Sequence, residues 1–176
     1  VGVLTFDAHH DVRVLDTGPR NGTPIRGLIA DGLPADQVRQ IGIHSFANSA
    51  PYRRWCDEQG IGIATMADVE AEGIDHVVSR ALGELAAGCE WIHVDFDIDV
   101  LDRAFAPGCP GARPGGMTPR QLVAAARLCG RHPKVRSADF VEVDPVADRD
   151  DVTVMALAGT LLAFLSGAAQ LKESER

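Results

Sequence analysis

The opening of the chain places a predicted buried strand directly before a group of metal-capable side chains. It reads Val1-Gly2-Val3-Leu4-Thr5-Phe6-Asp7-Ala8-His9-His10-Asp11. The first six residues are apolar except for Thr5, which is typical of a strand buried on both faces of a parallel sheet. The polar residues that follow are then expected at the carboxyl end of the strand, where open parallel sheets bind their ligands.

The same pattern recurs along the chain and predicts the fold class. Four more apolar runs end in polar or acidic residues: Val38 to Ile43, Ile61 to Thr65, Trp91 to Val94, and Val135 to Val143. Segments with helical spacing lie between them: Pro24 to Ala30, Ala50 to Gln59, Asp75 to Ala87, Thr118 to Leu128, and Asp151 to Gln170. Strands that alternate with helices predict one α/β domain over residues 1–176, with a mainly parallel sheet and helices on both faces.

One helix start has a strong local signal. Thr118 is the expected N-cap, Pro119 occupies the first helical position, and Gln121 follows three residues after the cap. By contrast, residues 99–117 are rich in proline and glycine. A loop of that length within a compact domain usually has a function.

Composition limits the classes of partner. The chain has 176 residues and 45% hydrophobic content, enough for one domain with a core. Its net charge is −8 and no cluster of Lys or Arg is present, so nucleic acid is not an expected partner. The four cysteines have no C-x-x-C spacing and are interpreted as reduced thiols of a cytoplasmic protein.

An uncharged apolar segment runs from Val152 to Ala169 and has nearly the length of a membrane span. Gly159, Gly167 and several hydroxyl side chains dilute its hydrophobicity. The segment is therefore predicted to be a buried helix of a soluble fold, and no membrane partner is expected.

Asp7, His9 and Asp11 form the first candidate site. If the backbone stays extended after the strand, its period of two places these three side chains on one side. His10 would then face away from them. A solvated loop is the alternative interpretation of such a short motif.

Four carboxylates within eight residues form a second cluster, at Asp95, Asp97, Asp99 and Asp102. Because like charges this close cannot all ionise without compensation, a bound divalent cation is expected. Carboxylate ligands with one or two imidazoles suit Mn²⁺, and Fe²⁺ or Zn²⁺ less well. Two metals roughly 3.5–4 Å apart would share carboxylates and activate water. Asp95 and Asp102 are alternatively hydrogen-bond acceptors behind the ligands, or turn residues.

A third element is Phe140-Val141-Glu142-Val143-Asp144-Pro145, at the end of another apolar run. Glu142 is expected on the same face as Phe140 and Asp144, where its carboxylate would bind a cationic guanidinium or formamidinium group. The alternative is an ordinary charged residue at the end of a strand.

These three elements together resemble the ureohydrolase superfamily, which includes arginase, agmatinase and formimidoylglutamase. The resemblance covers Val1 to about Ala169. It implies a three-layer α/β/α sandwich, a binuclear Mn²⁺ site and assembly as homotrimers or homohexamers. By the same resemblance the metal ligands are Asp7, His9, Asp11, Asp97 and Asp99.

The resemblance also implies roles in catalysis. Glu142 corresponds to the substrate-facing glutamate of the family, and Asp99 or a metal-bound water would pass a proton to the leaving nitrogen. The family's first metal-ligand His, in an upstream Gly-Gly-Asp/Asn-His segment, has no counterpart here. The chain is therefore expected to be N-terminally truncated and to correspond to the C-terminal two-thirds of the family domain.

Asn21 is a second departure from the family pattern, and it bears on the substrate. Arginases and many agmatinases carry a His at this position, whereas formimidoylglutamases commonly do not. Asn21 is accordingly a candidate substrate-binding residue, and a small amidine substrate of the formimino type is favoured. Arg13 and Arg20 are either holders of a substrate carboxylate or solvated loop charges.

Three other functions remain open at this stage. An agmatinase, guanidinobutyrase or arginase type of ureohydrolase would use the same site. A catalytically impaired regulatory relative would bind metal weakly, and an unrelated mononuclear-metal hydrolase would bind one metal per chain.

Overall fold

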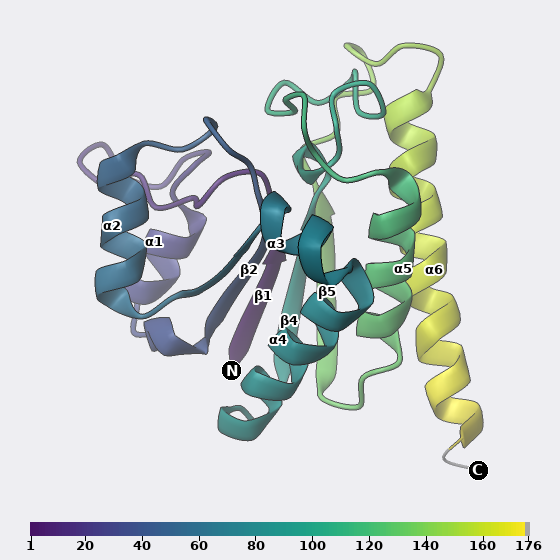
Figure 1. Cartoon of the computed structure of the whole chain (residues 1–176), viewed down its shortest axis with the longest axis horizontal. Helices are drawn as coiled ribbons and strands as arrows, with labels where there is room; N and C mark the ends of the chain where they lie inside the picture. Colours follow the sequence, from purple (N-terminus) through teal and green to yellow (C-terminus); the bar gives the residue numbers. More distant parts are fainter. Residues whose placement is uncertain (175–176) are drawn as a thin grey trace.

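The computed structural model describes residues 1–174 and has a five-stranded, fully parallel sheet in the order β3-β2-β1-β4-β5 (Figure 1). The strands are β1 Gly2–Phe6, β2 Val38–Ile43, β3 Gly62–Thr65, β4 Ile92–Asp97 and β5 Val135–Val141. The α-helices are α1 Pro24–Ala30, α2 Ala50–Gln59, α3 Met66–Glu72, α4 Ile74–Gly88, α5 Pro119–Gly130 and α6 Val152–Ser174. Short 3₁₀ helices cover Ala35–Gln37 and Ile98–Val100.

Helices cover both faces of the sheet, as expected for an α/β sandwich. On one face, Val3 and Val38 pack with Ile25 of α1 and Cys56 of α2. On the other face lies the larger core, to which α3, α4, α5 and α6 all contribute. Figure 1 shows α1 and α2 on one side of the strands and α4, α5 and α6 on the other. The predicted three-layer fold is therefore confirmed.

An aromatic stack crosses the middle of the larger core. The rings of Phe6 and Phe96 are parallel with centroids 5.0 Å apart, and Phe140 stacks on Phe96 at 4.9 Å. Phe164 of α6 meets both Phe96 and Phe140 edge-on at 6.1 Å. Three neighbouring strands are thus fixed to one another and to α6, directly below the strand ends.

The order of the strands determines where a ligand can bind. From β1 the chain proceeds to β2 and β3 on one side, and then returns to add β4 and β5 on the other side. The crossovers therefore diverge between β1 and β4. In open α/β sheets, ligands bind at the carboxyl ends of the strands at such a point. The first acidic cluster predicted from the sequence follows β1, and the second begins within β4 and continues beyond its end.

Most element boundaries agree with the sequence prediction. The bounds of β2, α1 and α2 are those expected, and the other predicted elements are shifted by a few residues at most. The capping box of α5 is present: Gln121 N donates to Thr118 Oγ1 at 3.3 Å, and Thr118 N donates to Gln121 Oε1 at 2.8 Å. Buried parallel strands and capped helices are strongly encoded by their local sequence.

The local structure differs from the predictions in three places. α3 and both 3₁₀ helices were not predicted, although Thr65 and Asp68 form a capping box for α3. β5 ends at Val141, so Glu142 is not a strand residue and has a left-handed backbone with φ 64°. β4 extends to Asp97, three residues beyond the predicted end.

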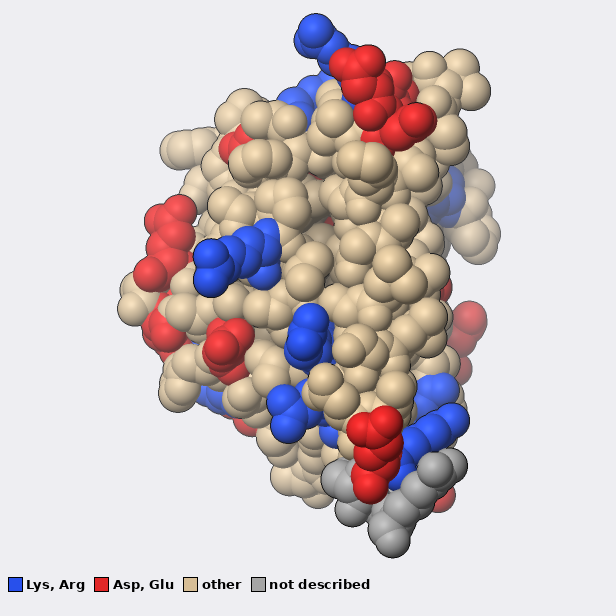
Figure 2. Space-filling view, turned by 90° about the vertical axis from the view of Figure 1, so that its right-hand side faces the viewer, with Lys and Arg blue, Asp and Glu red and all other residues tan. Residues whose placement is uncertain are grey.

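The helix α6 is less buried than predicted. Its inner face is buried at Thr153, Thr160 and Ala163, but Met155 and Leu162 are each 66% exposed. Figure 2 shows a largely uncharged surface on this side of the molecule. By length and composition alone, the segment Val152–Glu173 is apolar enough to cross a membrane. The expected absence of a membrane partner therefore stays a prediction.

Candidate metal and active site

The ends of β1 and β4 bring Asp7, His9 and Asp99 together. His9 Nδ1 lies 2.7 Å from Asp99 Oδ2 and 3.5 Å from Asp7 Oδ1. One donor atom from each residue lies within 4.8 Å of the other two. Asp7 and Asp99 are buried and His9 is partly exposed, so the group opens to solvent on the His9 side.

The loop after β1 holds these side chains by hydrogen bonds rather than by an extended backbone. His9 N donates to Asp7 Oδ1 at 2.6 Å. The side chain of Asn48 accepts from His10 N and donates to Ala8 O, both at 2.9 Å. The backbone was expected to stay extended to Asp11, with alternate side chains on one side. This expectation was wrong, because β1 ends at Phe6 and the chain turns directly after it.

His10 and Asp11 point in different directions from this turn. His10 is buried, with Nδ1 2.7 Å from Gln40 Oε1, so it faces away from the site as predicted. Asp11 has φ 53°, and its carbonyl accepts from Ile25 N at the start of α1 at 3.1 Å. This left-handed turn directs the Asp11 side chain into the pocket rather than along the strand.

Asp97 and Asp99 are linked through a short helical turn. Asp97 ends β4 and caps the 3₁₀ helix, since its Oδ1 accepts from Asp99 N at 2.8 Å. Asp99 Oδ1 in turn accepts from Ala8 N at 3.0 Å, which joins the two strand ends. The predicted shared strand face of Asp95, Asp97 and Asp99 was wrong for Asp99, which belongs to the helical turn.

Burial and like charges dominate the electrostatics of the cluster. Burial, and then the charges of Asp7 and Asp99, raise the pKa of Asp97 to about 11. The pKa of Asp7 is also raised well above its usual value, by burial and then by Asp99. Burial alone would raise the pKa of Asp99, but the hydrogen bond and charge of His9 hold it below its ordinary value. A divalent cation would favour the ionised form of every carboxylate here.

Cys109 belongs to this cluster although the sequence analysis did not select it. Its Sγ, Asp97 and Asp99 each offer a donor atom within 4.8 Å of the others. Burial, followed by the charges of the two aspartates, raises the pKa of the Cys109 thiol to about 12. Gly111 follows in the same loop, and a Cβ there would clash with Asp99 Oδ2. The long loop, for which a function was predicted from its length, thus packs on the cluster.

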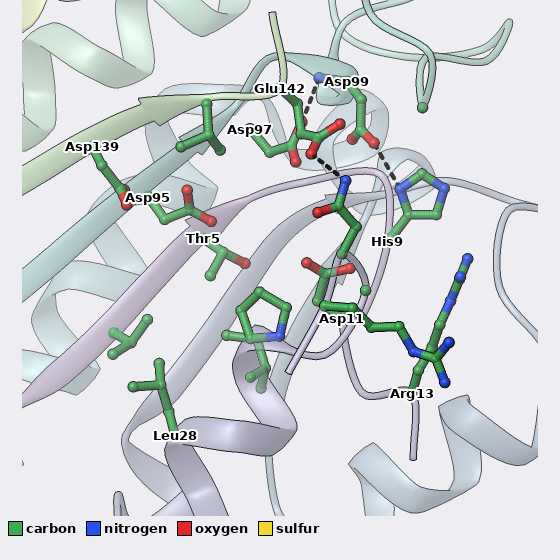
Figure 3. A pocket seen from close by; sticks show the side chains of 18 of the residues that line it. Thr5, His9, Asp11, Arg13, Leu28, Asp95, Asp97, Asp99, Asp139 and Glu142 are labelled. Carbon is green, nitrogen blue, oxygen red and sulfur yellow. Dashed lines mark hydrogen bonds and ion pairs between the residues drawn. The ribbon is translucent and has the colours of Figure 1, made fainter. Parts of the chain in front are cut away.

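A pocket of about 590 Å³ opens above the cluster and contains the remaining predicted site residues. Asp11, Asp97, Asp99, Glu142 and Asn21 all line it. Asn21 Nδ2 donates to Glu142 Oε1 at 3.1 Å, so these two candidate substrate contacts touch each other. Figure 3 shows Glu142 above Asp11, with His9 and Asp99 to one side. Glu142 was predicted to lie in an extended strand, which was wrong. The left-handed backbone of Glu142, directly after β5, nevertheless directs its side chain into the pocket.

Asp95 and Asp102 differ in where they lie. Asp95 lines the pocket beside Asp139, and burial and then the charge of Asp139 raise its pKa to about 8. Asp102 instead accepts from Ala104 N at 2.8 Å and Gly115 N at 2.7 Å. Asp102 is therefore a turn residue of the long loop, one of the two alternatives considered for it.

The donor set fits a divalent metal. Buried carboxylates and one imidazole, among which burial and then neighbouring charges raise the pKa values of Asp7 and Asp97, are chemically suited to Mn²⁺. The neighbouring Cys109 is a neutral thiol in this environment and contributes no charge.

The chain is similar to known proteins in sequence and in structure. The family model of the arginase family matches residues 1–166. Formimidoylglutamase of Halalkalibacterium halodurans is 43% identical over 169 residues, which cover 95% of this chain and 53% of that protein. The crystal structure of formimidoylglutamase from Bacillus subtilis superposes with a TM-score of 0.92 at 37% identity, covering 95% of this chain and 53% of that one.

A more distant structure shares the fold. Trypanosoma cruzi formiminoglutamase, determined with Mn²⁺, superposes with a TM-score of 0.88 at 22% identity. The match covers 96% of this chain and 57% of that one. The chain thus spans about half the length of the curated relatives it matches, a smaller share than the two-thirds expected from the resemblance.

Proposed function

Because this chain belongs to the arginase family, we propose that it carries the metal-binding and substrate-binding residues of a manganese-dependent hydrolase that cleaves a linear C–N bond of an amidine. A formimino substrate is proposed first, because the two formimidoylglutamases from Halalkalibacterium halodurans and Bacillus subtilis, at 43% and 37% identity, are more similar in sequence to this chain than the arginase of Bacillus caldovelox, at 30%. Guanidino substrates, as used by an agmatinase, guanidinobutyrase or arginase, are the alternative within the same chemistry.

The observation that carries the proposal is the convergence of Asp7, His9 and Asp99 from two adjacent strand ends. In our proposal these residues, with Asp11 and Asp97, hold the metal. When bound, Mn²⁺ supplies Lewis acidity and makes water a stronger nucleophile at neutral pH. The buried carboxylates would then be ionised, since the cation offsets their repulsion.

The other pocket residues would bind and orient the substrate. Glu142 accepts hydrogen bonds from the amidinium group, and its carboxylate favours the cationic form of that group. Asn21 positions Glu142 by the hydrogen bond to its Oε1. Asp99 would accept a proton from the attacking water and pass it to the leaving nitrogen.

The test is metal content and turnover of the 176-residue chain after Mn²⁺ reconstitution and desalting. We expect bound Mn²⁺ and release of formamide or ammonia from formiminoglutamate, or of urea from guanidino compounds. Asp97→Asn should lower metal content strongly, because it replaces a charged carboxylate of the proposed metal site with a neutral amide. Asp139→Asn is the matched control, because Asp139 lines the pocket but pairs with His93 instead.

Each outcome separates the proposal from its rivals. Full turnover in Asp97→Asn would contradict the assigned metal site. One metal per chain with turnover would favour a mononuclear hydrolase. Neither metal nor turnover would favour a non-catalytic relative that keeps the fold.

Assembly into homotrimers or homohexamers and a cytoplasmic location are part of the same proposal and rest on the family. Light scattering during size-exclusion chromatography of the Mn²⁺-loaded chain tests the assembly. A monomer at all concentrations would contradict it.

A further inference from the structure

The long loop after β4 is attached to the first turn of α6 through Gly108. Gly108 N donates to Thr153 Oγ1 at 2.7 Å, and the Thr153 side chain is fully buried. Figure 1 shows this loop and the start of α6 side by side above the carboxyl ends of the strands. A residue of α6 that lies outside the pocket is thus linked to the loop that packs on the metal cluster.

Asp148 and Thr153 form one hydrogen-bonded unit. Thr153 Oγ1 donates to Asp148 Oδ1 at 2.7 Å while it accepts from Gly108 N. The same carboxylate accepts from Thr153 N at 3.1 Å and from Val154 N at 3.0 Å. These backbone donors belong to the first turn of α6, where N–H groups have no acceptor within the helix. Asp148 therefore fixes both the start of α6 and the direction of the Thr153 hydroxyl.

Gly108 also holds the segment that carries Glu142. Its carbonyl oxygen accepts from Asp144 N at 2.8 Å, two residues after Glu142. The backbones approach so closely here that a Cβ built on Gly108 would lie 2.5 Å from Asp148 Cβ. Both polar backbone groups of Gly108 are therefore used, one toward α6 and one toward the segment after β5.

The residues directly after Gly108 lie against the proposed metal ligands. Cys109 Sγ is within 4.8 Å of donor atoms of Asp97 and Asp99, and a Cβ on Gly111 would clash with Asp99 Oδ2. Arg103 Nη1 donates to Cys109 O at 3.2 Å. Because Arg103 belongs to the same loop, this bond braces the loop but does not attach it to a helix. The attachment to α6 is made at Gly108.

We propose that Asp148 and Thr153 are positioning residues of the active site, which act through Gly108 on the loop at Asp99 and on the segment that carries Glu142. The proposal rests on the proposed function, in which Asp99 holds metal and Glu142 binds substrate. A buried N–H group without an acceptor is unfavourable, so loss of the Thr153 hydroxyl would force Gly108 to move. That movement would displace both parts of the site together.

The test is Thr153→Val, which removes the hydroxyl and keeps the branched shape. We expect the Mn²⁺ dissociation constant to rise about 10-fold, as for loss of a group that supports metal ligands. KM for formiminoglutamate should rise as well, because Glu142 is displaced. A variant that only lost stability would give less folded protein, with both constants of the folded fraction unchanged. Both are measured well below the thermal midpoint of each variant, and Thr153→Ser, which keeps the hydroxyl, should restore both.

Thr160→Val is the matched control, since Thr160 is also buried on α6 but its Oγ1 donates to Ala156 O within the helix at 2.9 Å. It should leave both constants unchanged. Gly108→Ala should reproduce the effect of Thr153→Val, because the added Cβ overlaps Asp148, and it replaces Thr153→Val if that variant does not fold. Unchanged constants in folded Thr153→Val would overturn the proposal, as would equal changes in Thr160→Val.

Thiol labelling of the metal-free chain separates this proposal from the proposed function. Cys109 of the loop and Cys129 of α5 are both fully buried, and α5 packs on the α6 backbone at Gly130. With N-ethylmaleimide and mass spectrometry, Thr153→Val should label Cys109 about 10-fold faster than wild type, as for loss of a buried hydrogen bond, with Cys129 unchanged. If wild type neither binds Mn²⁺ nor turns over substrate but this selective labelling is seen, the proposed function fails and the positioning of the loop by Thr153 stands. If wild type is active but Cys109 labelling is unchanged, or rises equally at Cys129, the positioning role is wrong and the proposed function stands.

Discussion

The two faces of β4 differ in almost every physical property, although their residues alternate along one strand. Three apolar side chains face the larger core and three polar ones face the pocket side: Ile92, Val94 and Phe96, against His93, Asp95 and Asp97. The apolar three are all fully buried. On the other face, burial raises the pKa of Asp95 to about 8 and that of Asp97 to about 11.

The difference shows how one strand separates stability from chemistry. Burying Phe96 removes apolar surface from water and stabilises the fold at any pH. Burying Asp97 without a cation opposes ionisation and adds nothing to stability at neutral pH. Packing of the apolar face thus keeps the acidic side chains of the other face in buried positions that are unfavourable for their charged forms. Substitutions on the apolar face should therefore mainly change stability, and substitutions on the polar face should mainly change metal binding.

The largest expected effect is on the apolar face. Phe96→Ala should lower the free energy of unfolding by about 3–5 kcal/mol, because it removes a buried ring and leaves a cavity. The ring stacks on Phe6 at 5.0 Å and on Phe140 at 4.9 Å, so few neighbours can move in to fill the gap. Urea denaturation followed by circular dichroism measures the change. Phe96→Leu is the control and should lose less, since it leaves a smaller cavity.

If the two faces are separable, the Phe96→Ala protein that remains folded should still bind Mn²⁺ in the same amount. A loss below about 1 kcal/mol would mean that the aromatic stack is not what positions the strand ends.

The second effect concerns the polar face and has a definite sign with pH. In the metal-free protein, burial raises the pKa of Asp11 to about 6 and that of Asp95 to about 8, against 3.8 for an ordinary aspartate. Between pH 4 and 8 the folded state therefore binds more protons than the unfolded state, and the free energy of unfolding falls as pH rises. The raised pKa of His9 acts in the same direction. His10, His44 and His132, whose pKa values are lowered mainly by burial, act in the opposite direction below the ordinary histidine value of 6.5.

We expect the thermal midpoint of the chelator-treated protein to fall by at least about 3 °C from pH 5 to pH 8, equivalent to roughly 1 kcal/mol for a domain of this size. Asp95→Asn should reduce this dependence. Saturating Mn²⁺ should reverse it, because metal ligands must be deprotonated. A midpoint that rises with pH in the presence of chelator would contradict the electrostatics described above.

Much of the fold could be predicted because it is encoded locally. Buried strands such as β2 have continuous apolar runs, and the N-cap at Thr118 is defined by its nearest neighbours. The site could be anticipated as a group of residues, since Asp7 and Asp99 follow apolar runs. The sequence could not predict that β1 and β4 are adjacent in the sheet, because strand order depends on contacts between distant segments.

The geometry of the site required the structure. The extended backbone assumed for Asp11 and Glu142 is replaced by left-handed turns. Aspartate is enriched among non-glycine residues in this conformation, but glutamate is not, and no local rule marks these two positions in particular. Cys109 escaped notice because its approach to Asp97 depends on the path of a long loop. The capping box of α3 is encoded locally, since Asp68 stands three residues after Thr65.

The smallest expected effect lies on the polar side of the sheet, next to β4 but away from the metal ligands. Ser137 Oγ lies 2.8 Å from His93 Nδ1, on an exposed part of β5. Ser137→Ala should change the free energy of unfolding by less than about 1 kcal/mol, because both groups can bind water instead. Urea denaturation measures this change, and Mn²⁺ content should stay at the wild-type value. A large loss of metal would mean that the hydrogen bond between Ser137 and His93 helps to hold Asp97 in position. The polar side chains of β4 would then depend on one another. An unchanged metal content would restrict the site to the strand ends, that is, to Asp97 at the end of β4 and the residues in the turns that follow β1 and β4.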